Sequence, residues 1–285
     1  MSTYLIITKV QKDAIFVFTC EINAHFSSSS SPSYFFFPLM ADDKSTTLCQ
    51  PLSLTNVQNL LDSVDCFLFD CDGVIWKGDT LIDGVPQTLE MLRSKGKKLV
   101  FVTNNSSKSR KQYAHKFQSL GIPVTEEEMF SSSFAATMYL KVNEFPPEKK
   151  VYVIGGEGII EELKLAGFIG LGGPEDGKKT VQLKANTLFE HDKSVGAVVV
   201  GIDPYINYYK LQYGTLCIRE NPGCIFIATN RDATGNMTDL QEWPGAGCMV
   251  RCCNLRVNGE RAYCSRKTFH LFNGLFAETI QYSYN

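Results

Sequence analysis

The sequence lacks an excess of charge of either sign: 28 basic and 30 acidic residues give a formal net charge of −2 and a pI near 6.1. Such a balance creates no field that would gather nucleic acid or anionic lipid, so we expect neither partner. The chain also lacks a membrane-spanning run, because the apolar stretches at residues 4–10 and 15–20 are too short. Its 285 residues, 44% of them hydrophobic, are enough for one large or two modest domains, and we expect a soluble globular protein.

Several site signatures are incomplete as well. The 10 cysteines have no repeating spacing, and the adjacent pair Cys252-Cys253 does not fit the paired spacing of a zinc site, so we interpret them as reduced intracellular thiols. The glycine-rich residues 155–158 do not complete a dinucleotide-binding fingerprint and indicate a tight turn. His115 and His191 are isolated on polar segments, and we expect both to be solvated rather than catalytic.

The first 39 residues differ in composition from the rest. They contain a serine run at 27–31 and an aromatic cluster at 34–37, and no arginine precedes Arg93. A transit peptide is rich in arginine as well as serine. We therefore favour Met40 as the natural start, with residues 1–39 as an upstream extension, and keep organelle targeting as the alternative.

Two carboxylates follow an apolar run at residues 66–69: Asp70 and Asp72, with Gly73 directly after them. The run has the length of a strand buried on both faces, and Gly73 allows the chain to turn out of the sheet. An aspartate in such a pair can attack phosphorus or bind Mg2+, while its neighbour moves a proton. The alternative is a solvated turn with two incidental acids, but the strand before the pair favours a site.

A second apolar strand, residues 98–102, ends in Thr103, Asn104 and Asn105, and a helical pattern resumes at residues 110–120. A hydroxyl, two amides and the N–H groups of a helix start would form a phosphate cradle that needs no net positive charge. An ordinary helix cap is the alternative. Because functional groups of parallel sheets gather at the carboxyl ends of strands, two such strand ends favour the cradle.

These motifs resemble the haloacid-dehalogenase-like phosphatases, and within them the phosphoglycolate/4-nitrophenyl phosphatase branch, especially its plant cytosolic members. The resemblance covers roughly residues 63–250 and rests on residues 69–76, 101–106, 201–204 and 226–232. It implies that Asp70 is the nucleophile, that Asp72 is the general acid/base, and that Thr103, Asn104 and Asn105 bind the phosphoryl group. It also implies Mg2+ held by the Asp70 carboxylate, the Asp72 backbone carbonyl and a later acid. Asp72 must then hold its proton near neutral pH, which burial or a neighbouring carboxylate would favour.

The expected fold class is α/β, with a doubly wound parallel, Rossmann-like core that is incomplete at the C-terminus and carries an inserted α/β cap domain. We assign residues 1–39 to a non-native or disordered extension, 40–123 and 233–250 to the core, and 124–232 to the cap. Residues 251–285 form a divergent tail that replaces the rest of the core. In the family the cap selects the substrate, which places a pocket for a small phosphorylated metabolite at the junction. Assembly as a homodimer through the cap is the candidate quaternary state.

The tail lacks the family's Gly-Lys-Pro-Ser element and its Gly-Asp-x-x-x-Thr-Asp element. A shifted reading frame explains this, since residues 261–270 read one nucleotide later permit Glu-Pro-Ile-Val-Leu-Gly-Lys-Pro-Ser-Thr. Without the strands that this part of the chain would supply, the strand at residues 66–69 would have an unpaired edge, and such an edge invites aggregation. Loss of the lysine should cost on the order of 10²–10³ in rate.

We therefore expect an impaired Mg2+-dependent phosphatase for 2-phosphoglycolate or a similar small ester, located in the cytoplasm, or in the plastid if residues 1–39 are a transit peptide. The alternatives are an inactive isoform that binds phosphorylated ligands or partner subunits, and a non-functional translation product.

Overall fold

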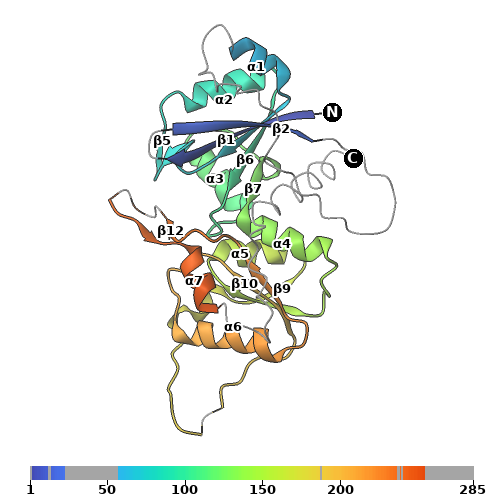
Figure 1. Ribbon diagram of the computed structural model, residues 1–285, viewed down its shortest axis with the longest axis vertical. Coiled ribbons are helices and arrows are strands. Elements are labelled where there is room, and N and C mark those ends of the chain that lie inside the picture. The colour runs from blue at the N-terminus through green and yellow to red at the C-terminus, as the bar shows by residue number, and fades with distance from the viewer. Residues whose placement is uncertain are drawn as a thin grey trace, which may run out of the picture.

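The computed structural model describes residues 2–11, 14–22, 57–186, 188–235, 238 and 240–253. Within them the chain forms two parallel sheets, each covered by helices, with one sheet in the upper and one in the lower part of Figure 1. The expected α/β class with a core and a cap is confirmed. No helix in these ranges is long and apolar enough to cross a membrane.

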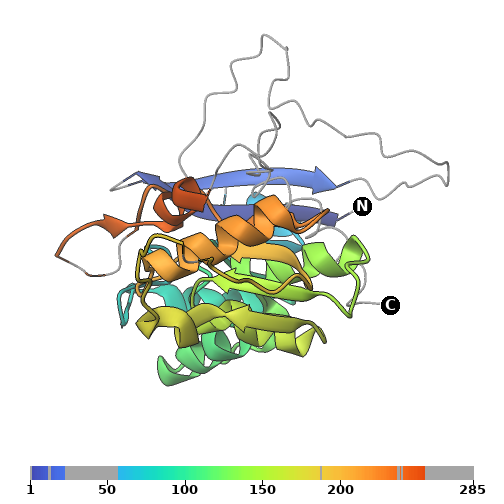
Figure 2. The same ribbon diagram turned by 90° about the horizontal axis from the view of Figure 1, so that it is seen from below.

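The core sheet has the order β2-β1-β3-β6-β7. Its strands are β1 (Ser2–Gln11), β2 (Ala14–Ile22), β3 (Cys66–Asp70), β6 (Lys98–Thr103) and β7 (Met129–Ser131). All neighbouring strands are parallel except β1 and β2, which form an antiparallel hairpin. Figure 2 shows this hairpin along one side of the molecule.

Strand β3 is buried on both faces because its side chains alternate between two apolar clusters. Phe67 and Phe69 pack with the helices α1 (Val57–Ser63), α2 (Val85–Ser94) and α3 (Arg110–Ser119). Cys66 and Leu68 pack on the other face with α4 (Ser132–Val142). A small hairpin, β4 (Trp76–Lys77) and β5 (Thr80–Leu81), follows the turn after β3.

The second sheet, which belongs to the cap, has the order β11-β10-β8-β9, and all its strands are parallel. Its strands are β8 (Lys150–Ile154), β9 (Ile169–Gly172), β10 (Val195–Val200) and β11 (Ile225–Ala228). Helices α5 (Glu157–Leu165) and α4 cover one face, while α6 (Tyr208–Glu220) and α7 (Ala246–Cys253) cover the other. The connections include two 3-10 turns, η1 (Glu126–Glu128) and η2 (Gly173–Lys178), and a short ladder of β12 (Thr234–Gly235) and β13 (Trp243–Pro244).

The borders between core and cap differ from the sequence-based ones. Strand β7 pairs with β6, so the chain leaves the core sheet after Ser131 rather than at residue 124. Helix α7, which we had assigned to the core within 233–250, packs through Met249 and Val250 in the cap cluster. Helix α4 is shared, because Phe134 contacts the core cluster and Leu140 the cap cluster.

The prediction of an unpaired edge beside β3, the strand that ends in Asp70, is wrong. Strand β1 occupies that edge and pairs in parallel with β3, from Tyr4 opposite Cys66 to Ile7 opposite Phe69. The described parts of the extension are therefore a hairpin, although the choice of Met40 as the start stays a prediction. Most of the divergent tail, residues 254–285, lies outside the described residues, and so does the segment on which the frameshift hypothesis depends.

Candidate active site

Asp70 and Asp72 lie where β3 ends, on either side of a buried residue. Cys71 between them is fully buried in the core cluster of β3, whereas Asp70 is partly buried and Asp72 is exposed. Burial, together with the charges of Asp70 and Asp72, raises the pKa of the Cys71 thiol well above its ordinary value. One oxygen of Asp70 accepts a 2.8 Å hydrogen bond from the Cys71 backbone N–H.

Asp72 sits in a tight turn that closes on Trp76. Gly73 has φ 82°, and its N–H donates to the Trp76 carbonyl at 2.7 Å. The indole Nε1 of Trp76 donates to Asp72 Oδ1 at 2.8 Å. Asp72 itself is exposed, so the burial that we expected around it is not found.

The register of β3 and β6 brings the second motif, Thr103 to Asn105, to the carboxyl end of the sheet where Asp70 lies. Asp70 pairs with Val102, so Thr103, which is 1% exposed, follows one residue beyond. Tyr113 of α3 borders both motifs: burial first, and then the charge of Asp72, raises the pKa of its hydroxyl, while side-chain hydrogen bonds with Thr103 and Ser107 lower it. Asp72 and Thr103 therefore both influence the Tyr113 hydroxyl.

The loop that begins with Thr103 is held by its own side chains and by distant ones. The Asn105 N–H donates to Thr103 Oγ1 at 3.2 Å, and the Ser107 N–H donates to Asn105 Oδ1 at 2.9 Å. The Asn104 amide donates to Asp232. Burial raises the pKa of Asp232 above its ordinary value, and the bond from Asn104 only partly opposes that rise. The Asn104 carbonyl accepts from Asn230 Nδ2 and from Ser132 Oγ, each at 2.7 Å.

The start of α3 is not available for a phosphate, contrary to the sequence-based prediction. Ser109 and Gln112 form a capping box, in which each side chain accepts from the other's backbone N–H. The N–H of Arg110 donates to Glu162 of the cap at 2.7 Å. A cap carboxylate therefore occupies the place at the helix N-terminus where an anion would bind.

The junction between core and cap is close-packed around residues 106–110. The Gly158 N–H donates to the Ser107 carbonyl at 3.1 Å, and a Cβ on Gly158 would lie 2.2 Å from the Lys108 carbonyl carbon. Thr229, just after β11, hydrogen-bonds to Ser106 at 3.2 Å. The carboxyl ends of the cap strands therefore rest on the loop that carries the second motif.

The fit of a metal ion is partial. The Asp70 carboxylate and the Asp72 carbonyl are hard oxygen donors of the kind that Mg2+ prefers. Among the residues that the structure describes, however, no three His, Cys, Asp or Glu side chains are grouped to hold a metal. The later acid that the resemblance implies is therefore not found in this part of the chain.

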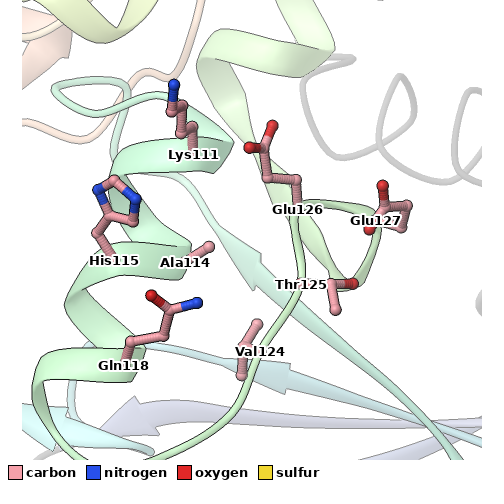
Figure 3. Close-up of a pocket in the computed structure, with 8 residues that line it drawn as sticks. All are labelled: Lys111, Ala114, His115, Gln118, Val124, Thr125, Glu126 and Glu127. Carbon is pink, nitrogen blue, oxygen red and sulfur yellow. The ribbon is translucent and has the colours of Figure 1, made fainter.

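A cavity of about 310 Å³ lies elsewhere, between α3 and residues 124–127 (Figure 3). None of the five candidate site residues lines it, whereas His115 does. His191 is not solvated as expected, because its side chain is 3% exposed and Nε2 lies 3.0 Å from Asn221 Oδ1.

Comparison with known proteins agrees with the motifs. Residues 67–169 match the family described as haloacid dehalogenase-like hydrolase. Phosphoglycolate phosphatase 2 of Arabidopsis thaliana is 77% identical over 202 residues, which cover 70% of this chain and 67% of that protein. The chloroplastic phosphoglycolate phosphatase 1A of the same plant is 68% identical over 69% of this chain and 54% of its own length. Human glycerol-3-phosphate phosphatase is 34% identical over 79% of this chain and 72% of its own.

Solved structures give the same assignment. The p-nitrophenyl phosphatase from Archaeoglobus fulgidus superposes with a TM-score of 0.56 at 25% identity, covering 73% of this chain and 74% of that one. A glycerol phosphate phosphatase from Mycobacterium tuberculosis, in complex with magnesium, superposes with a TM-score of 0.54 at 27% identity. The match covers 68% of this chain and 53% of that one. The chain belongs to the haloacid dehalogenase-like hydrolases. Within them it falls in the branch of the phosphoglycolate and 4-nitrophenyl phosphatases, and it spans 54–67% of the plant relatives described above.

Proposed function

We propose that this chain is a Mg2+-dependent phosphate-monoester hydrolase for 2-phosphoglycolate or a similar small ester, with impaired activity. The observation that carries the proposal is the register of β3 and β6, which sets Asp70 beside Val102 and Thr103 just beyond. A nucleophilic carboxylate and a phosphoryl-binding hydroxyl are thus adjacent at one sheet edge. The names of the two plant relatives support the choice of substrate.

In the first step a carboxylate oxygen of Asp70 attacks phosphorus, and the bond from phosphorus to the ester oxygen breaks. Asp72 gives its proton to the leaving alkoxide. The product alcohol departs, and the phosphoryl group remains as an acyl phosphate on Asp70. Thr103, Asn104 and Asn105 orient the phosphoryl oxygens, and this positioning lowers the barrier by holding the ester in line with Asp70.

In the second step Asp72, now a carboxylate, takes a proton from water. The resulting hydroxide attacks phosphorus, the bond to Asp70 breaks, and inorganic phosphate leaves. The exposure of Asp72 is compatible with this role, because the residue must reach first an ester oxygen and then a water.

The Asp70 carboxylate and the Asp72 carbonyl would hold Mg2+, which when bound screens the negative charges of carboxylate and phosphate from each other. The described residues supply no further acid to this set. We therefore expect weak metal binding and a low rate. We also propose a cytoplasmic location and a homodimer through the cap, with a plastid location as the alternative that the chloroplastic relatives keep open.

The test is phosphate release by purified 1–285 from 2-phosphoglycolate and from pyridoxal phosphate, with Mg2+ and with a chelator. Slow turnover that requires Mg2+ supports the proposal. Thermal stabilisation by 2-phosphoglycolate without any turnover would instead indicate an inactive, ligand-binding isoform. Turnover at the rate of a complete relative would contradict the expected impairment.

A further inference from the structure

One buried aromatic side chain contacts the predicted general acid. Trp76 Nε1 donates to Asp72 Oδ1 at 2.8 Å, and the two residues also form an isolated parallel bridge. Trp76 is 0% exposed, whereas Asp72 is exposed. A rigid donor therefore holds an acceptor that would otherwise rotate in solvent.

The indole ring has no room to move. Its neighbours are Phe117, whose ring centroid lies 4.7 Å away in an edge-on arrangement, and the Lys116 ammonium, 4.4 Å from the indole centroid. Lys116 is fixed in turn, since its Nζ donates to the Gly78 carbonyl at 2.9 Å. The lysine thus ties the ring to the β4–β5 hairpin.

The backbone between donor and acceptor is equally constrained. The N–H groups of Ile75 and Trp76 both donate to the Cys71 carbonyl, at 2.9 and 3.3 Å. With the Gly73 bond to Trp76, these contacts close a single compact turn. The geometry of the indole–carboxylate bond is therefore set before any ligand arrives.

We propose that Trp76 is a positioning residue that holds Asp72 for proton transfer to the leaving group. This inference rests on the proposed function of Asp72. An indole N–H only donates, so Oδ1 is the acceptor in this bond, and Oδ2 is the oxygen left to exchange a proton with the leaving group. The bond thus selects one carboxyl oxygen for catalysis and limits side-chain rotation, the kind of preorganisation that raises rates.

The kinetic test uses Trp76→Phe, which keeps an aromatic ring but removes the donor, and compares kcat/KM for two esters. The alkoxide leaving group of 2-phosphoglycolate needs a proton, whereas 4-nitrophenolate leaves without one. We expect a loss of roughly 10-fold for 2-phosphoglycolate, within the range for removal of an orienting partner, and little change for 4-nitrophenyl phosphate. The control is Trp243→Phe, at the exposed tryptophan bonded to Thr238. Equal losses on both esters would overturn the positioning role.

A second measurement does not depend on turnover. The chain has two tryptophans and hence two indole N–H signals in a nitrogen–proton correlation spectrum. Asp72→Ala should shift the Trp76 signal alone, and Thr238→Ala should shift the Trp243 signal alone. If Asp72→Ala moves neither signal, the contact does not exist and the inference is overturned. Absence of turnover in the wild type would overturn the proposed function, and with it the positioning role of Trp76, while a shifted signal would still confirm the contact.

Discussion

Glu162 of the cap accepts a 2.7 Å hydrogen bond from the backbone N–H of Arg110, the first residue of core helix α3. The same carboxylate lies 3.2 Å from the Arg110 guanidinium, and the neighbouring Glu161 accepts from Ser109 Oγ at 2.6 Å. Burial raises the pKa of Glu162 above its ordinary value of 4.5, and Arg110 opposes that rise. These contacts join the cap to the helix that follows the second motif.

Glu162→Gln should loosen this junction. The amide keeps the shape of the side chain but loses the charge, and charge-assisted hydrogen bonds contribute about 1.5–3 kcal/mol each. We expect the free energy of unfolding to fall by about 1–2 kcal/mol, and the amides of residues 104–110 to exchange faster with solvent. Mass-detected hydrogen exchange measures the second effect. Glu157→Gln, on the exposed side of the same helix, is the control, and equal effects of the two variants would contradict the account.

The hairpin β1–β2 should protect the core sheet from self-association. Ile6→Pro removes a ladder N–H from the strand that pairs with β3, because proline has no donor, whereas Ile6→Val keeps it. We expect the proline variant, and likewise a chain that starts at Met40, to aggregate through the uncovered edge of β3. Light scattering after size-exclusion chromatography would detect this. A stable chain from Met40 that does not aggregate would show that the hairpin is dispensable.

Stability should fall in acid through the pair Lys150–Asp192 of the cap. The bond from Lys150 Nζ, 2.7 Å long, is the largest cause that lowers the pKa of Asp192, from 3.8 to about 2. An acid with a lowered pKa in the folded state adds stability above its unfolded value, and that contribution disappears as pH falls from about 4 to about 2. Because both side chains are about one-third exposed, we expect only about 1 kcal/mol.

Lys150→Gln should remove this contribution at pH 6 and narrow its difference from the wild type as pH approaches 2. Urea unfolding at several pH values would show the trend. The more exposed pair Lys193–Glu220 provides the control, since Lys193→Gln should change stability less than Lys150→Gln does at pH 6. A Lys150→Gln deficit that stays constant down to pH 2 would contradict the assignment.

The local pattern of the sequence was enough to predict β3 and β6 and the meeting of their carboxyl ends. Continuous apolar runs between polar ends permit few other structures, and parallel register then places Thr103 one residue beyond Val102, the partner of Asp70. The helix at 110–120 was predicted for a similar reason and corresponds to α3.

Other features depend on contacts between distant residues, for which no local pattern in the sequence is a signal. Helix α4 begins in a serine run that is typical of a turn, yet Ser131 caps the helix and Ser133 donates to the Lys108 carbonyl. Glu161 and Glu162 have the pattern of an ordinary helix surface, because their partners lie 52 residues away. The pairing of β1 with β3 likewise joins segments about 60 residues apart, which periodicity alone does not predict.

The central claim is that Asp70 is the nucleophile, and Asp70→Asn tests it most directly. Phosphate release from 2-phosphoglycolate should be measured for the wild-type chain and this variant, each with Mg2+ and with a chelator. We predict slow, Mg2+-dependent turnover by the wild type and a loss of roughly 10⁴-fold or more in Asp70→Asn, since an amide oxygen is a poor nucleophile. An Asp70→Asn chain that turns over at the wild-type rate would contradict the account.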